Sequence, residues 1–150
     1  MMNINARLLS GAISGLAIAI ALPIALPMTP APAHQVTVEN DVGGTLHIEP
    51  NDVPRAGQET LTWFALARRG GQTIPLAACH CALSVYQPFG EEAIATPDLE
   101  AISAEGYRGI PSANLTFPRP GQYELVLTGR PVTDDDFSPF TLRFDVTVAR

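Results

Sequence analysis

Apolar and polar residues alternate in short runs through most of the chain after residue 33. The clearest run covers residues 140–149, where every second residue from Phe140 to Val148 is apolar and most residues between them are polar. Residues 122–129 show the same period of two, with Tyr123, Leu125 and Leu127 on one face. Alternation of this kind predicts β-strands that bury one face and leave the other in solvent.

Seven strands are predicted in all. In addition to the two above, the pattern predicts strands over residues 35–39, 45–49, 59–67, 74–86 and 113–117. Clusters of Gly, Pro, Asn and Asp separate them, as is typical of turns. Residues 87–112 are rich in Gly and Pro and are predicted to be mostly loop, with a possible helical turn over residues 99–105.

Short strands without amphipathic helices predict an all-β protein, because a parallel sheet needs helices to cover its faces. We therefore expect an immunoglobulin-like antiparallel β-sandwich of about seven strands. Large aromatic side chains supply most of the apolar area of a small core. The residues expected in the middle of this core are Trp63, Tyr123, Phe140 and Phe144.

The first 33 residues resemble a secretory signal peptide. Arg7 precedes an apolar stretch over residues 8–26, and no other charge occurs before Glu39. Ala31 and Ala33 place small residues at positions −3 and −1 of a cleavage site after Ala33. We expect a signal-peptide helix that is removed, rather than retained as a membrane anchor. Residues 34–150 would then be exported to the periplasm or another extracytoplasmic compartment, without membrane insertion.

Length and charge limit the function further. Residues 34–150 are enough for a single domain and too few for two ordinary ones. The whole chain has fifteen acidic residues against nine basic ones, a formal charge of −6. This balance disfavours nucleic acid and anionic membranes as partners, since both are polyanions.

Cleavage after Ala33 would leave His34 as the first residue. Its free α-amine and imidazole Nδ1 could then chelate a metal in a six-membered ring, an arrangement that suits copper(II). His47 is the expected second ligand, because it points away from Leu46 and Ile48 and so toward solvent. A hairpin that turns through residues 40–44 would place His34 about 10 Å along the strand from His47. The terminus would have to curl back; the alternative is a disordered His34 and a solvent-facing His47.

Cys79 and Cys81 are the only cysteines, and they share a strand face, with His80 on the opposite face. Two thiolates on one face could bind copper(I), which prefers sulfur ligands. A disulfide between them would need a kinked strand, and a reducible one would suit a redox role. Burial as two small apolar residues is the remaining alternative.

Two stretches resemble a known family. "TLHIEPNDVPRAGQETLTWFALARRGGQTIP", which precedes the cysteine-bearing strand, and "FPRPGQYELVLTG" are similar to YtkA-like exported sandwich domains, distant relatives of CopC-type periplasmic copper-resistance proteins. The resemblance covers about residues 47–149 and implies an immunoglobulin-like fold. In CopC-type proteins a mature N-terminal histidine, a second histidine and a carboxylate hold copper(II). His34 matches the first role, but no late Asp-x-His pair matches the others.

These observations favour an exported binding module that handles copper, with His34, His47, Cys79 and Cys81 as candidate ligands. The alternative is a non-metal envelope or lumenal interaction domain, with a protein partner and structural cysteines. No recognisable set of acid, base and nucleophile is present, so we do not expect an enzyme.

Overall fold

A computed structural model describes residues 34–134 and 136–150. The expected signal peptide and its cleavage site lie outside the described residues, which begin at His34. Among the residues that are described, no helix is both long and apolar enough to cross a membrane.

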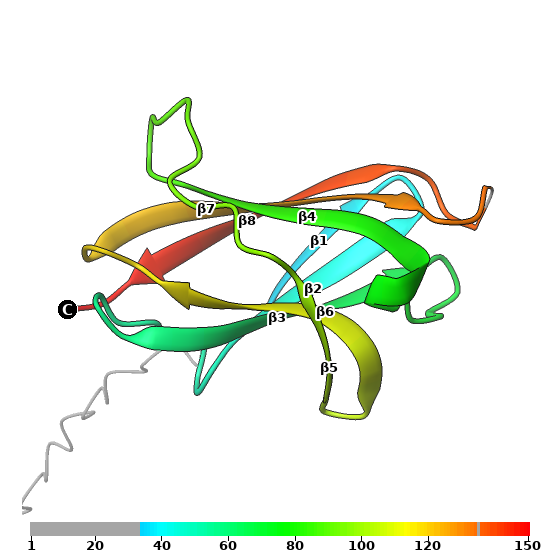
Figure 1. Cartoon of the computed structure of the whole chain (residues 1–150), viewed down its shortest axis with the longest axis horizontal. Coiled ribbons are helices and arrows are strands. Elements are labelled where there is room, and N and C mark those ends of the chain that lie inside the picture. Colours follow the sequence, from blue (N-terminus) through cyan, green and yellow to red (C-terminus); the bar gives the residue numbers. More distant parts are fainter. Residues whose placement is uncertain (1–33, 135) are drawn as a thin grey trace, which may run out of the picture. The chain divides into compact units, whose positions relative to one another are not determined.

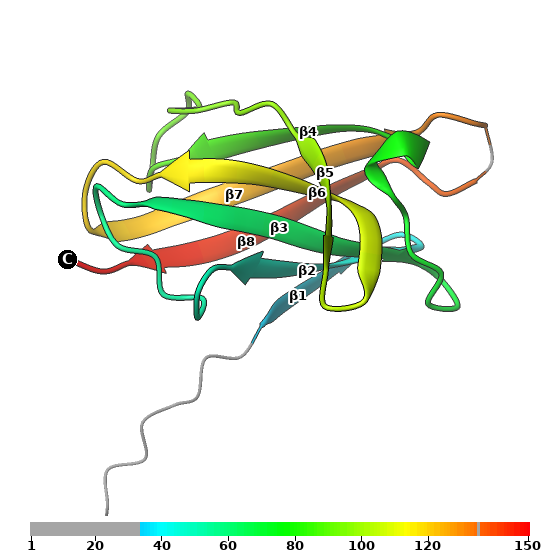
Figure 2. The ribbon, with the colours of Figure 1, turned by 60° about the horizontal axis from the view of Figure 1, so that its bottom comes forward.

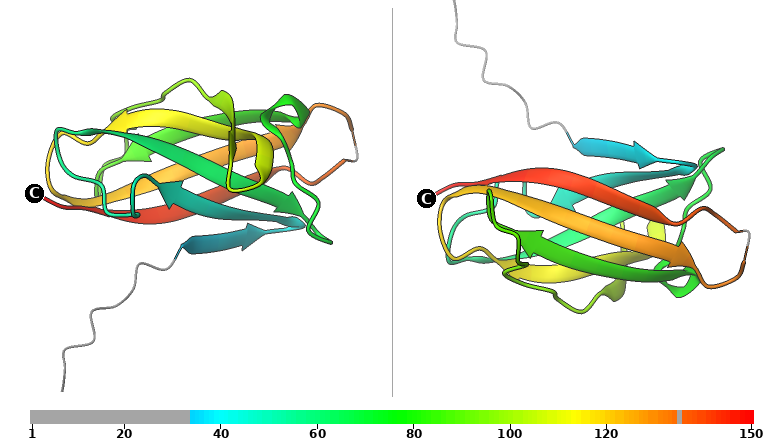
Figure 3. Two further views of the ribbon diagram at one scale, coloured as in Figure 1. Left: turned by 90° about the horizontal axis from the view of Figure 1, so that it is seen from below. Right: turned by 90° about the horizontal axis from the view of Figure 1, so that it is seen from above.

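The described residues form two antiparallel sheets, which confirms the predicted all-β sandwich (Figure 1). The five-stranded sheet has the order β1-β2-β3-β6-β5, and the three-stranded sheet has the order β4-β7-β8. Figure 3 shows each sheet in front in turn. The strands are β1 (Gln35–Glu39), β2 (Val42–Ile48), β3 (Glu59–Arg68), β4 (Cys79–Tyr86), β5 (Glu100–Ala104), β6 (Tyr107–Thr116), β7 (Gly121–Pro131) and β8 (Phe140–Val148). A short 3-10 turn, η1 (Leu76–Ala78), precedes β4.

The β5–β6 hairpin corrects the prediction that residues 87–112 are mostly loop, and β5 occupies the place of the possible helical turn. The Gly and Pro residues of this segment are typical of loops, so its strands were not predicted. Two of the glycines allow a tight, bent hairpin, since Gly106 and Gly109 have φ angles of 87° and 67°. Figure 2 shows the hairpin curling across the outer face of the five-stranded sheet.

The main core lies between the two sheets and contains Tyr123, Phe140 and Phe144, as predicted. The Phe64 and Phe144 rings, one from each sheet, lie 5.5 Å apart between centroids. The Tyr123 hydroxyl donates a hydrogen bond to the Arg119 carbonyl at 2.8 Å, and so closes the corner before β7. These contacts hold the two sheets together and so fix the position of the five-stranded sheet, whose other face points outward.

Trp63 is fully buried, but the prediction that it fills the middle of the sandwich was wrong. It belongs to a second cluster with Ala65 and Ile110, separate from the inter-sheet core. Ile102 and Ala104 of the β5–β6 hairpin pack against this cluster. β3 is thus buried on both faces, and its continuous apolar run from Trp63 to Leu66 gave no sign of which residue faces which side.

Candidate metal site

The β1–β2 hairpin places His34 beside His47. The two strands pair with Gln35 opposite Leu46 and Glu39 opposite Val42, so the turn consists of Asn40 and Asp41 alone. Asn40 adopts a φ of 56°, which Asn tolerates better than most residues. The predicted turn over residues 40–44 was too long. The expected separation of about 10 Å between His34 and His47 was therefore too large. The two imidazole rings lie 4.1 Å apart between centroids.

Asp52 joins the two histidines from the loop that follows β2. Its backbone N–H donates to the Ile48 carbonyl at 2.7 Å, and its Oδ1 accepts from the Ile48 N–H at 2.8 Å. This tight turn, which contains a cis Glu49–Pro50 peptide, leaves Oδ2 3.0 Å from His34 Nδ1. Sequence reasoning missed Asp52 because Asn-Asp in a loop is ordinary turn chemistry. The one available signal was its position four residues after the strand that carries His47.

Trp63 holds the His47 ring from the other side. The two rings are stacked, with centroids 3.7 Å apart and planes within 2° of parallel. The Trp63 Nε1–H donates to Glu49 Oε1 at 3.3 Å, which ties the indole to the start of the Asp52 loop. The His47 ring is therefore fixed between Trp63 and His34 before any ligand arrives.

His47 is buried, which corrects the prediction that it faces solvent. It is 7% exposed, because Trp63 and His34 cover the outer face of the sheet at this point. Burial lowers the pKa of His47, and the neighbouring His34 lowers it further, while Glu105, Asp52 and Glu49 act in the opposite direction. A lowered pKa keeps the imidazole neutral at neutral pH, the form that binds metals.

The site is an open cavity of about 270 Å³, lined by both histidines, Asp52, Glu49 and Glu105, together with Ile48, Pro50 and Asn51. Each of His34, His47 and Asp52 offers one ligand atom, and these atoms all lie within 4.8 Å of one another. The His34 side chain is 51% exposed, so the cavity opens on that side. Two imidazoles and a carboxylate so arranged could hold a metal ion.

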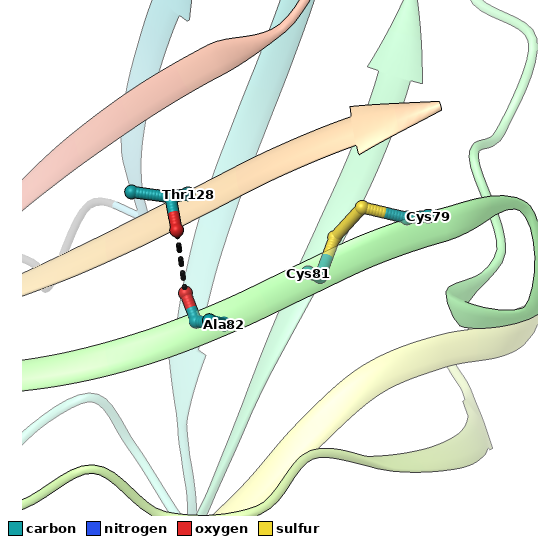
Figure 4. The surroundings of a disulfide bond; sticks show 4 residues. All are labelled: Cys79, Cys81, Ala82 and Thr128. Carbon is teal, nitrogen blue, oxygen red and sulfur yellow. Dashed lines mark hydrogen bonds between the residues drawn. A yellow bond between two sulfur atoms is a disulfide. The ribbon is translucent and has the colours of Figure 1, made fainter. Parts of the chain in front are cut away.

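Cys79 and Cys81 lie elsewhere, on β4 in the three-stranded sheet, and are joined by a disulfide with their Cα atoms 5.2 Å apart (Figure 4). The predicted division of the strand is confirmed, since Cys79, Leu83 and Val85 are buried whereas His80 is exposed. A bridged pair offers no thiolate, so the copper(I) hypothesis concerns only the reduced form.

No family model matches the chain, and no curated protein matches it in sequence. Its fold is similar to the crystal structure of a DUF4426 family protein from Pseudomonas aeruginosa PAO1, with a TM-score of 0.55. The two chains are 11% identical, and the match covers 77% of this chain and 96% of the other. At that identity the likeness shows the fold alone, which is a β-sandwich.

Proposed function

We propose that the protein is an exported β-sandwich that binds copper(II) through His34, His47 and Asp52. The observation that carries the proposal is the convergence of these three side chains on one cavity. Two ligand atoms at right angles, each about 2.0 Å from an ion, are about 2.8 Å apart. His34 Nδ1 and Asp52 Oδ2, at 3.0 Å, already have nearly this separation.

Copper(II) is the first-row divalent ion expected to bind this donor set most tightly. Imidazole nitrogen and carboxylate oxygen suit a tetragonal copper(II) site, and copper(II) binds such donors most tightly in the first-row series. Cleavage after Ala33 would add the α-amine of His34 as a fourth donor. The ligands would then be a terminal histidine, a second histidine and a carboxylate, the types implied by the resemblance to CopC-type proteins.

Two features support export. The first is the apolar segment over residues 8–26, with its small residues before His34. The second is the Cys79–Cys81 disulfide, since such bonds persist in oxidising compartments and are rare in the cytosol. These features support the proposal that the protein is exported to the periplasm or an equivalent lumen.

A copper(II) titration of metal-free protein that begins at His34 tests the proposal. We expect one equivalent to bind with a Kd below about 1 μM, measured by calorimetry against a competing chelator. His47→Asn and Asp52→Asn should each weaken binding at least about tenfold. His80→Asn is the matched control, because His80 is exposed on the other sheet and should leave the Kd unchanged.

The proposal fails if wild-type protein binds no tighter than micromolar, or if the two site variants bind as wild type does. Electron paramagnetic resonance adds a readout that separates the site from surface adsorption. Coordination by the two histidines should give nitrogen hyperfine structure that His47→Asn reduces. Failure of both measurements would favour the interaction-domain alternative.

A further inference from the structure

The Cys79–Cys81 disulfide links no two elements of the fold. Both of its ends lie on β4, and it encloses only His80 (Figure 4). A disulfide stabilises a protein mainly by restricting the unfolded chain, and the effect grows with the length of the closed loop. A loop this short restricts very little. The bond therefore contributes little as a structural crosslink.

Pairing with β7 holds β4 in place without the disulfide. Every residue of β4, from Cys79 opposite Pro131 to Tyr86 opposite Glu124, has a partner on β7. Leu83 and Val85 of β4 are also buried in the inter-sheet core. Reduction would thus leave two thiols on one face of a strand that keeps its position.

The fold makes room for the sulfur atoms. Gly129 lies opposite Cys81 on β7, and a Cβ at this position would stand 2.8 Å from Cys79 Sγ and would also clash with the Phe140 ring. The two cysteines differ in exposure: Cys79 is 6% exposed and packs in the core, whereas Cys81 is only partly buried. An incoming thiolate can therefore approach the residue Cys81 more easily than Cys79, which makes Cys81 the expected point of attack and Cys79 the leaving group.

We propose that Cys79–Cys81 is a redox-active disulfide that exchanges with a protein dithiol. A thiolate of the dithiol attacks Cys81 Sγ, the Cys79–Cys81 bond breaks, and Cys79 leaves as a thiolate that takes up a proton. The second thiolate of the dithiol then attacks its own partner sulfur in the mixed disulfide, and Cys81 is released and protonated. Two electrons and two protons pass to Cys79 and Cys81, and the dithiol is oxidised to a disulfide.

Reduction of the folded protein is the first test. With dithiothreitol in native buffer, we expect the bond to open much faster than the protein unfolds, with an unchanged far-UV spectrum and protected β4 and β7 amides. Glutathione buffers of increasing reducing strength should carry the pair from mainly oxidised to mainly reduced. A bond that opens only at the rate of global unfolding, or stays oxidised throughout, is structural, and the proposal fails.

Single-cysteine variants test which sulfur is attacked. Cys79→Ser leaves the accessible Cys81, which should form a mixed disulfide with oxidised glutathione at least about tenfold faster than the buried Cys79 of Cys81→Ser. Equal rates would overturn the assignment. If a variant fails to fold, the reduced wild type can be alkylated and each cysteine followed by mass spectrometry. Cys81 should then react faster than Cys79. None of these readouts depends on copper, so they succeed or fail independently of the proposed metal site.

Discussion

At the scale of single residues, the proposed metal site depends on the stacking contact between Trp63 and His47. Trp63 is the only tryptophan in the chain, and its ring is stacked on that of His47 with centroids 3.7 Å apart. The indole is fully buried and is held by its hydrogen bond to Glu49. The intrinsic fluorescence of the protein therefore reports directly on the candidate site.

We predict that copper(II) quenches this fluorescence. An ion bound to His47 would lie within a few ångströms of the stacked indole, where a paramagnetic metal efficiently deactivates its excited state. Emission should fall to a plateau at one equivalent, and addition of a strong chelator should restore it. His80→Asn should quench as wild type does, whereas emission unchanged at full calorimetric saturation would place the copper away from Trp63.

At the scale of elements, the β1–β2 hairpin determines whether a site exists. Its alternating pattern predicted both strands, but Gly43 and Gly44 were assigned to the turn, and the register was wrong as a result. Gly44 in fact lies within β2, where a Cβ would come 2.5 Å from Leu142 Cδ1. The glycine is needed for close packing on β8, a tertiary reason that a local pattern does not reveal.

This explanation of the two glycines predicts unequal effects of the same substitution. Gly44→Ala should destabilise the protein by about 1–3 kcal/mol, because the new methyl group meets Leu142 and Leu66 in the core. Gly43→Ala is the control: its Cβ would face the other way, with Val38 nearest at 3.7 Å, so a change within about 0.5 kcal/mol is expected. Urea unfolding measures both values, and equal losses would contradict the packing explanation.

The same hairpin carries an acid-sensitive contact. Asp41 in the turn accepts a hydrogen bond from the Ser138 N–H at 2.9 Å, just before β8. That bond, with a further contribution from the Ser138 side chain, lowers the pKa of Asp41 from its usual 3.8. The folded protein thus holds this proton less tightly than the unfolded chain does. The stabilisation is complete above the unfolded pKa and is lost as the pH falls from about 4 through the folded pKa.

Below about pH 4, the stability of Asp41→Asn should therefore fall less steeply with decreasing pH than that of the wild type. Thermal unfolding of metal-free protein between about pH 2.5 and 6 would measure it. Asp145→Asn changes an exposed aspartate of β8 and serves as the comparison. A pH profile of Asp41→Asn that matches the wild type would show that the Ser138 contact contributes nothing.

At the scale of the whole molecule, the candidate metal site and the disulfide lie on different sheets, and only the first depends on where the chain begins. The sequence pattern predicted the sandwich because strand alternation is a local property. The sequence also pointed to His34 and His47, but it missed Asp52 and the stacked Trp63, because these two come to the histidines through a loop and a neighbouring strand. His34 was identified from an expected processing event, and that event also determines what His34 can donate.

The α-amine that cleavage after Ala33 would leave on His34 therefore gives the strongest prediction about copper(II) affinity. Protein that begins at His34 offers an α-amine beside the imidazole, whereas the same protein with this amine acetylated offers only an amide nitrogen there. We expect the acetylated form to bind copper(II) at least about tenfold more weakly, since a basic nitrogen donor and its chelate ring are lost. The two forms share His47, Asp52 and Trp63, so their unfolding midpoints without metal should agree and serve as the control. Equal copper affinities would mean that the three side chains hold the ion without the amine.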